Sequence, residues 1–425
     1  MGGYQLFYKV FPGLKQLIYY QSSNLKGDLS AAIIVSILFI PQSMAYAVIA
    51  GVPIVMGLYA ATIPLIIYAL FGSSNYLSVG PISIVSLLAF SGVSSIAKPN
   101  TNTFLELIIV LAFIIGFLQL TMGLMKTGKI FDYISPLVVQ GFTSAVAIII
   151  ALNQIKSLMG VSLPKYENLL IYSSNIYHKL PDINFFTLSI GIGSFLFLLL
   201  LKRIPKITFL GPLFLVVAST LLVRFFDLHL KGVATIGSIP KGLPQFSVNL
   251  PTLEIFQLLF PIAFMIAIIS FLESYAVVKT LASKKKEKIN SNQELVGLGL
   301  ANISSSFIGA IPVGGALSRT AVNYNSGAKS NLSLLLTAIL VLISLQFLTP
   351  LFYYLPMAAL ASIIIIAVSH LINLREMVDL IKARSKATIL FFITFFSTLM
   401  IDIFYGLVIG ILLSMLMFIQ KIRII

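Results

Sequence analysis

The sequence predicts an all-α protein that crosses a membrane many times. Of its 425 residues, 58% are hydrophobic and only 10% are charged. A soluble protein of this length cannot bury so much apolar surface, whereas a membrane protein leaves it facing lipid. Apolar runs of about 17–25 residues recur along the chain, and each is long enough to cross a hydrocarbon core of about 30 Å as a helix.

Fourteen segments are expected from these runs, and basic residues alternate between the gaps that separate them. The segments are 29–50, 54–70, 81–97, 103–125, 133–157, 185–201, 208–223, 254–278, 293–311, 315–324, 331–349, 355–372, 387–401 and 403–420. Alternate gaps and both termini hold 20 of the 28 Lys and Arg, the opposite gaps and the adjoining end of segment five hold seven, and one lies inside segment ten. This asymmetry predicts a multi-pass protein of the inner (cytoplasmic) membrane with both termini in the cytoplasm.

The alternation also accounts for the net charge of +15, so we expect no nucleic acid as partner. The basic run 284–288 is interpreted as a solvated cytoplasmic loop, with contact to lipid headgroups as the alternative. Cys is absent, which excludes disulfides and thiol ligands. His178, His229 and His370 share no metal spacing. We therefore expect no metal site and no cofactor.

The chain divides near its centre into two halves of seven segments. Hydrophobicity falls over residues 224–253, which are rich in Pro and Gly. An odd number of segments in each half means that the second half enters the membrane with the opposite orientation, which is the condition for an inverted repeat. We expect the first repeat over residues 1–235 and the second over residues 236–425.

The third segment of each half is abnormal. Segment three follows Gly80-Pro81, is too short for a bilayer core and is rich in Ser, and segment ten opens with Pro312-Val313-Gly314-Gly315. Paired short, Gly/Pro-interrupted segments at matching places indicate a transporter binding site. Two half-helices whose N-termini face one gap direct their N–H groups and positive dipole ends at it, which favours an anion.

Two charged residues lie in apolar surroundings. Glu273 ends the apolar run 255–272, and Arg319 follows the apolar stretch 308–317 with one residue between. Such residues cost roughly 2.5–3.5 kcal/mol each on insertion scales, so they usually face a cavity and carry function. One acid and one base in different segments indicate a site for a charged solute.

Several motifs in order resemble the sulfate permease (SulP) family of anion transporters. They are Pro41-Gln42-Ser43-Met44-Ala45-Tyr46-Ala47, Ala50-Gly51-Val52-Pro53, Gly57-Leu58-Tyr59, Pro64, Tyr68, Phe71-Gly72-Ser73-Ser74, Gly80-Pro81, Gln140-Gly141-Phe142, Glu273-Ser274 and Pro312-Val313-Gly314-Gly315-Ala316-Leu317-Ser318-Arg319-Thr320-Ala321-Val322-Asn323. The resemblance covers residues 25 to about 420, the transmembrane region. The family usually continues into a cytoplasmic STAS domain, so the sequence is either a truncated member or one without that domain. Asn75 stands where the family usually has a basic residue.

The resemblance implies fourteen helices in a seven-plus-seven inverted repeat, with half-helices at segments three and ten preceded by short extended stretches. Segments 1–4 and 8–11 would form a core domain and segments 5–7 and 12–14 a gate domain, and transport would be an elevator-like displacement of core against gate. The substrate-binding positions carried over to this chain are Gln42, Tyr46, Ile82, Ser83, Ala316, Leu317, Ser318 and Arg319. Glu273 matches the position linked to proton or sodium coupling.

Each of these residues has a structural alternative. Gln42 follows a mid-helix proline and would otherwise satisfy the carbonyl that the proline frees. Glu273 would otherwise be a buried structural acid paired with a neighbour such as Arg319, and Arg319 a scaffold ion-pair partner. The hydroxyls of Ser83 and Ser318 would otherwise bond back to their own helices.

We expect a secondary active transporter of small anions of the sulfate, bicarbonate or dicarboxylate class, and no enzyme. Glu273 favours proton-coupled symport, because an ionised carboxylate repels an anion and a protonated one does not. The alternatives are a sodium-coupled bicarbonate symporter, an uncoupled anion exchanger or channel, a voltage-responsive motor and a nucleobase permease. Gly406 and Gly410 predict close helix packing, with a dimer face, and so a homodimer, as the alternative.

Overall fold

The computed structural model describes residues 11–164, 166, 168–204, 208–240, 242–248, 250–285, 289–383 and 386–423. Several basic residues of the predicted alternation lie outside these ranges: Lys9, Lys165, Lys206, Lys241, Lys286, Lys288 and Arg384. The chain divides into two compact units. Unit 1 comprises residues 1–128, 201–214 and 237–353, and unit 2 comprises residues 129–200, 215–236 and 354–425.

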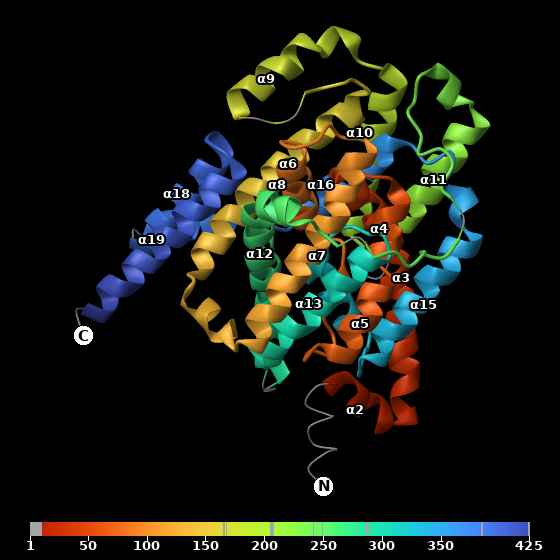
Figure 1. Ribbon diagram of the computed structural model, residues 1–425. Helices are drawn as coiled ribbons and strands as arrows, with labels where there is room; N and C mark the ends of the chain where they lie inside the picture. Colours follow the sequence, from red (N-terminus) through yellow and green to blue (C-terminus); the bar gives the residue numbers. More distant parts are fainter. Residues whose placement is uncertain are drawn as a thin grey trace. The chain divides into compact units, whose positions relative to one another are not determined.

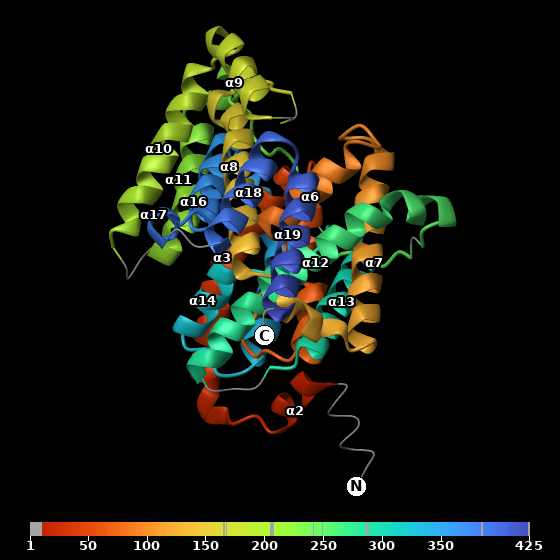
Figure 2. The same cartoon turned by 90° about the vertical axis from the view of Figure 1, so that its left-hand side faces the viewer.

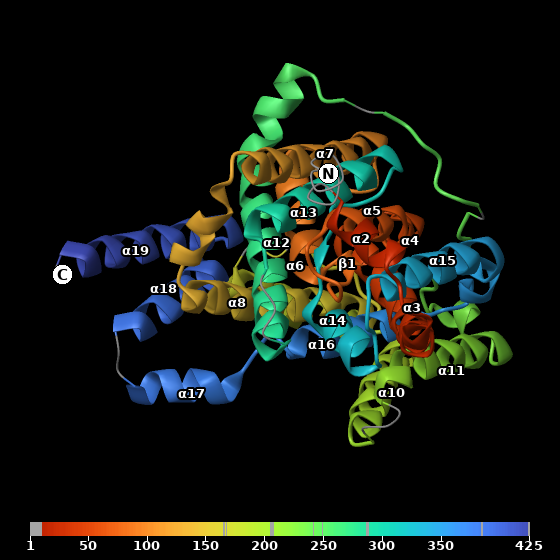
Figure 3. The same cartoon turned by 90° about the horizontal axis from the view of Figure 1, so that it is seen from below.

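Unit 1 is a helical bundle with one short pair of strands inside it (Figures 1 and 3). Its α-helices and strands are α2 (Pro12–Ile18), α3 (Leu25–Ile49), α4 (Ile54–Ala60), α5 (Ile63–Phe71), β1 (Val79–Gly80), α6 (Ser83–Val93), α7 (Asn102–Leu124), α12 (Leu253–Lys285), α13 (Ser291–Phe307), β2 (Gly314–Gly315), α14 (Leu317–Asn325) and α15 (Leu332–Phe347). The 3₁₀ turns η1 (Ser22–Asn24), η4 (Thr208–Leu210) and η6 (Thr349–Phe352) also belong to unit 1. A fourth, η2 (Thr127–Tyr133), crosses from unit 1 into unit 2.

Helix α3 contacts α4, α6, α14 and α15 within unit 1. It continues through Pro41, whose missing N–H and ring normally kink a helix. The predicted single segment 54–70 is instead two helices, α4 and α5, that meet at residues 61–62. Pro64 lies in the first turn of α5, where the absent N–H costs nothing, so the chain restarts there as a new helix.

The strands β1 and β2 pair in antiparallel register, Val79 with Gly315 and Gly80 with Gly314. The pair needs residues without side chains. A Cβ at Gly314 would lie 2.7 Å from Cδ1 of Ile82, and one at Gly315 would lie 2.6 Å from Cδ1 of Leu77. The glycines therefore permit two interrupted helices to share one pair of backbone strands in the middle of the unit.

A buried amide network holds the chain that enters β2. Asn302 of α13 both donates to the carbonyl of Val313, at 3.1 Å, and accepts from its N–H, at 2.8 Å. The same amide donates to Oε1 of Gln119 on α7, whose Nε2 donates to Oγ of Ser270 on α12 at 2.8 Å. Helix α13 thus satisfies both backbone groups of Val313, and α7 and α12 hold the Asn302 amide in place, as buried polar groups require.

Unit 2 contains α8 (Pro136–Met159), α9 (Leu169–His178), most of α10 (Phe185–Lys202) and of α11 (Gly211–Phe225), α16 (Met357–Ser369), α17 (Leu374–Ala383), α18 (Lys386–Met400) and α19 (Ile403–Arg423), with turns η3 (Leu180–Asp182) and η5 (Leu228–Lys231). Gly406 and Gly410 of α19 face α18. A Cβ at Gly410 would lie 2.5 Å from Oγ1 of Thr394 and 2.7 Å from Cγ1 of Val138. Close packing at these glycines therefore occurs within the chain, and the homodimer stays a prediction.

Each of the fourteen predicted segments overlaps a helix of the structure. In the described part of the chain, seven helical stretches are long and apolar enough to cross a membrane, and further apolar helices are shorter. Helix α12 runs past its predicted end at 278 to Lys285, because Val278 and Ala282 are still buried. The prediction of an all-α membrane protein is confirmed, whereas the inverted repeat stays a prediction.

Candidate functional site

The predicted half-helices α6 and α14 both begin without a side-chain cap. Their N-cap residues, Ile82 and Ala316, have extended backbones (φ −134°, ψ 147° and φ −99°, ψ 124°), and neither side chain accepts a hydrogen bond. An apolar N-cap leaves the N–H groups of the first helical turn for another partner. Two helix starts with open donors and positive dipole ends are therefore present in unit 1.

The strand pair brings these two helix starts together. The chain passes from β1 through residues 81–82 into α6, and from β2 through Ala316 into α14. Because β1 and β2 are antiparallel, the two helices leave the pair in opposite senses. Ala316 is tied down further, since its N–H donates to the carbonyl of Ser78 at 3.1 Å.

Arg319 reaches from the first turn of α14 back to the start of α6. Its Nη1 donates to the carbonyl of Pro81 at 3.0 Å and lies 3.4 Å from Oε1 of Gln42, and its Nε lies 3.4 Å from Oγ of Ser78. The guanidinium carbon lies 4.3 Å from the ring centroid of Phe39, a cation–π contact. The side chain is fully buried, with 0% exposure.

Arg319 has no carboxylate partner within the described residues. The one ion pair found there is Lys179–Asp182, on the surface of unit 2. The alternative in which Glu273 and Arg319 form a buried pair is therefore wrong. The Nη2 atom of Arg319 is buried without a hydrogen-bond partner. An unpaired buried cation is costly, so this atom marks where an added anion would be stabilised.

Gln42 and Tyr46 lie one turn apart on α3, on the face that meets Arg319. Both are buried, and Gln42 turns its amide oxygen to Arg319. Within the described residues its amide makes no bond to the α3 backbone, so the alternative of satisfying the carbonyl freed by Pro41 is not observed. The phenol of Tyr46 lies close enough to Arg319 and Glu273 to interact electrostatically with both side chains.

Glu273 lies on α12 beside the strand pair. Its side chain is half-buried, and its Oε2 atom is buried without a hydrogen-bond partner. The next residue, Ser274, accepts a hydrogen bond from the N–H of Gly315 at 2.8 Å. The acid is thus connected through one residue to the strand that leads into α14, and no side chain of the described residues holds its carboxyl.

The remaining predicted positions differ in what their side chains do. Ile82, Ser83 and Ala316 are buried at the helix starts, whereas Leu317 is 53% exposed and Ser318 is also exposed. The hydroxyls of Ser83 and Ser318 make no hydrogen bond within the described chain, so bonding back to their helices is not observed. Positions 317 and 318 contribute their backbone N–H groups to the open helix start.

Sequence reasoning missed Phe39 and Ser78. Phe39 lies three residues before Gln42 on the same helical face, a spacing that a search for aromatic partners of Arg319 would have found. Ser78 supports both sides of the interruption: its carbonyl accepts from Ala316, its N–H donates to Oγ1 of Thr320 at 3.0 Å, and its hydroxyl faces Arg319. No periodicity marks it, because it precedes a two-residue strand.

Asn75 stands where related sequences usually have a basic residue, and its contact is local. Its side-chain oxygen accepts a hydrogen bond from Nε2 of Gln16 on α2. No group of three or more His, Asp or Glu in the part of the chain described here is placed to hold a metal ion.

Fold and site together define a class: a polytopic helical membrane protein in which two oppositely directed half-helices enclose a buried arginine. The chain belongs to the sulfate permease family, whose family model matches residues 25–394. The resemblance of the motifs is thereby confirmed.

Two plant proteins illustrate the relationship. The chain is 38% identical over 413 residues to "Sulfate transporter 4.1, chloroplastic" of Arabidopsis thaliana, covering 95% of this chain and 59% of that protein. It is 32% identical over 424 residues to "High affinity sulfate transporter 2" of Stylosanthes hamata, covering 95% and 63%. The chain therefore spans about three fifths of the length of these relatives.

Two solved structures have the same fold. One, described as "The overall structure of SLC26A9", superposes with a TM-score of 0.91 at 25% identity, covering 98% of this chain and 69% of that one. The other, "The transmembrane domain of a cyanobacterium bicarbonate transporter BicA", gives a TM-score of 0.78 at 20% identity, covering 93% and 97%. At 20% identity the second likeness shows the fold alone.

Proposed function

We propose that the protein is a secondary active transporter of small anions, which binds its substrate between the starts of α6 and α14. The observation that carries this proposal is Arg319, a fully buried guanidinium that has no carboxylate partner among the described residues and one unpaired nitrogen. A cation in this position is stabilised by an anion and destabilised by a second cation. The open N–H groups and positive dipole ends of two helices add donors for the same anion.

The substrate class follows from the kind of site. Backbone N–H groups and one guanidinium suit a compact oxyanion, because both donate hydrogen bonds to several oxygens. Sulfate is the substrate to test first, since the similar plant proteins are sulfate transporters by name. Bicarbonate and dicarboxylates belong to the same panel.

Glu273 is proposed as the coupling residue. Its unpaired Oε2 and its link through Ser274 to β2 place a titratable group beside the strand pair. When the carboxyl is protonated it does not repel an anion, so proton and anion binding favour each other, and this favouring is reciprocal. Sodium coupling is the alternative, and an uncoupled exchanger or channel is a further outcome that the assay below distinguishes.

The transport movement is proposed to be a displacement of unit 1 as a body relative to unit 2. All nine candidate residues lie in unit 1 (Gln42, Tyr46, Ile82, Ser83, Glu273, Ala316, Leu317, Ser318 and Arg319). A body that contains the whole site carries the substrate with it, which is what an elevator-like mechanism requires. An inner-membrane location with both termini in the cytoplasm remains our expectation for the topology.

The test is substrate flux into proteoliposomes that contain the purified protein. Labelled sulfate uptake is measured with an inward proton gradient, with an inward sodium gradient and with neither, and unlabelled bicarbonate and dicarboxylates compete. Uptake driven by the proton gradient supports proton symport, and uptake driven by sodium supports the alternative. Equal flux without any gradient would indicate an exchanger or channel. Absence of flux for every anion would contradict the proposed function.

A further inference from the structure

A surface pocket of about 570 Å³ lies where the N-terminal helix α2 meets the rest of unit 1. Figures 1 and 2 show α2 at the end of the unit where α3 begins. The pocket is formed by α2, by the turn that leads into α3, by Asn75 in the loop before β1 and by Lys329 in the loop after α14. Its lining therefore includes one residue from the loop that leads into β1 and one from the loop that follows α14.

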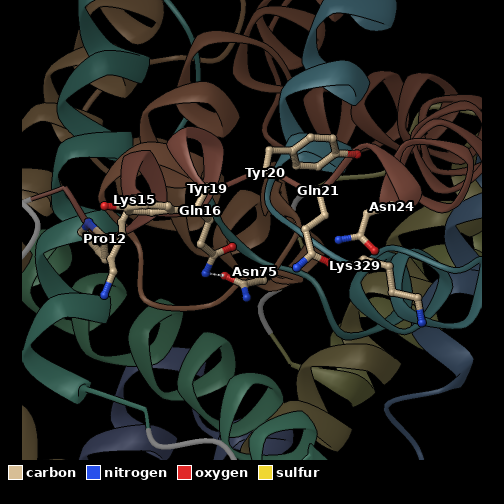
Figure 4. A pocket seen from close by; sticks show the side chains of 9 residues that line it. All are labelled: Pro12, Lys15, Gln16, Tyr19, Tyr20, Gln21, Asn24, Asn75 and Lys329. Atoms are coloured by element: carbon tan, nitrogen blue, oxygen red, sulfur yellow. Dashed lines mark hydrogen bonds between the residues drawn. The ribbon is translucent and has the colours of Figure 1, made fainter.

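Among the described residues the lining is basic and polar and includes no acid. Figure 4 shows Lys15 and Lys329 at opposite ends of a row of amides from Gln16, Asn75, Gln21 and Asn24. Both lysines are exposed, and neither has a carboxylate within ion-pair distance in the described chain. Two unneutralised ammonium groups with amide donors between them are the features of a site for an anion with several oxygens.

Asp28, an acid close to the pocket, already has hydrogen-bond partners. Asp28 is fully buried and accepts hydrogen bonds from the N–H of Lys329 at 2.6 Å and from the N–H and hydroxyl of Ser330 at 3.0 and 2.7 Å. It also accepts from the phenol of Tyr20 at 3.0 Å. Burial, together with this bond to Asp28, raises the pKa of Tyr20 to about 12, so the phenol adds no negative charge to the pocket.

The pocket is held in shape before any ligand arrives. Asn331 donates to the carbonyls of Gly13 on α2, at 2.9 Å, and Ala69 on α5, at 2.7 Å, and Gln16 donates to Asn75. These contacts fix α2 against unit 1 and leave the lysine side chains free to reorient. A preformed site binds with a smaller loss of conformational entropy.

An exposed apolar row begins at the edge of the pocket. Leu25, Leu29 and Ile33 follow Asn24 at intervals of four along α3 and are 48%, 44% and 44% exposed. Residues at this spacing share one helical face. In a membrane protein an exposed apolar face of a long apolar helix is covered by lipid. The basic pocket thus lies where that face ends, at the level expected for headgroups.

We propose that this pocket binds the phosphate headgroup of an anionic phospholipid, with the acyl chains against the row of Leu25, Leu29 and Ile33. The occupant joins α2 to the loop that leads into β1 and to the loop that leaves α14. It therefore stabilises the arrangement of the half-helix elements from outside the candidate substrate site. The shared chemistry is a phosphate anion, and a free phosphate compound is the other source of it.

The experiment is a binding titration of the purified full chain in neutral detergent by microscale thermophoresis. The probes are dioctanoyl phosphatidylglycerol, dioctanoyl phosphatidylcholine, glycerol 3-phosphate and inorganic phosphate. We expect the phosphatidylglycerol to bind more tightly than the other three probes. We expect the double variant Lys15→Gln/Lys329→Gln to bind it with an affinity lower by a factor of roughly ten or more. The matched control Lys129→Gln/Lys202→Gln removes two exposed basic charges elsewhere and leaves binding unchanged.

A second variant guards against a folding defect in the first. Gln21→Glu keeps both lysines and adds a negative charge at an exposed lining position, and it also weakens binding. Equal phosphatidylglycerol affinity in the native protein and in both pocket variants overturns the site. Equal affinity for glycerol 3-phosphate and the lipid overturns the lipid as occupant. Both binding measurements are independent of transport, so a failure of this proposal can be distinguished from a failure of the proposed transport function.

Discussion

Replacing Arg319 with Met tests whether its buried charge binds the anion or only braces the half-helices. The guanidinium makes one hydrogen bond of 3.0 Å to Pro81 and two longer contacts of 3.4 Å, and Nη2 is unpaired. A charge-assisted hydrogen bond contributes about 1.5–3 kcal/mol. If Nη2 donates such a bond to the anion, Arg319→Met weakens sulfate binding roughly 10- to 150-fold.

The same substitution has a different effect on stability. Arg319 is fully buried and has no carboxylate partner within the described chain, so its removal also removes an uncompensated charge. Apolar replacements of buried charged groups are often neutral or stabilising. We expect a thermal midpoint equal to or above that of the native protein, although the cation–π contact to Phe39 is lost. Weaker binding in a protein of undiminished stability distinguishes substrate contact from scaffold.

The assay is calorimetric titration of sulfate into purified protein in a chloride-free buffer of constant ionic strength. Asn325→Ala is the matched control, because Asn325 is exposed at the far end of the same helix and lies outside the candidate site. It should change the dissociation constant by less than about twofold. An Arg319→Met protein that binds sulfate as tightly as the native one would refute the role of the guanidinium and leave Arg319 as scaffold.

Three further substitutions test other parts of the site. Glu273→Gln should abolish sulfate uptake driven by a proton gradient. It should also make sulfate affinity independent of pH, whereas the affinity of the native protein should fall as pH rises. Undiminished gradient-driven uptake by the variant would contradict the assignment of Glu273 as the coupling residue. Asn302→Ala leaves the N–H and carbonyl of Val313 unsatisfied, which costs about 1–3 kcal/mol of folding free energy for each group. Thermal denaturation, followed by the near-ultraviolet circular dichroism of the Tyr and Phe side chains, should therefore show a lower midpoint. Gly315→Ala places a methyl group 2.6 Å from Leu77, so the rate of sulfate uptake should fall by a larger factor than the level of expressed protein. An uptake rate equal to that of the native protein would show that the strand pair tolerates a side chain.

Much of the fold was accessible from hydrophobic runs alone. A helix must satisfy its own backbone in lipid, so the length and apolar character of a stretch largely decide whether it forms a helix, and all fourteen predicted ranges overlap one. The break between α4 and α5 was missed because hydropathy does not record where a chain restarts. The division into units was not visible in composition, since each unit takes residues from both halves of the chain.

For the candidate site, the amino-acid sequence by itself determined which segments are interrupted and which charges they carry. Close approach of two backbone segments is indicated by Gly80, Gly314 and Gly315, since glycine within a regular element lowers stability unless its missing side chain is needed. Arg319 indicates a functional site, since a charged side chain in an apolar segment is costly unless it serves a function. Only the tertiary structure decided that Arg319 turns to Pro81, Gln42 and Phe39, that no ion pair to Glu273 forms within the described residues, and that Leu317 and Ser318 are exposed. Side-chain direction depends on how α3, α6 and α14 pack together, and no local pattern in the chain encodes that packing.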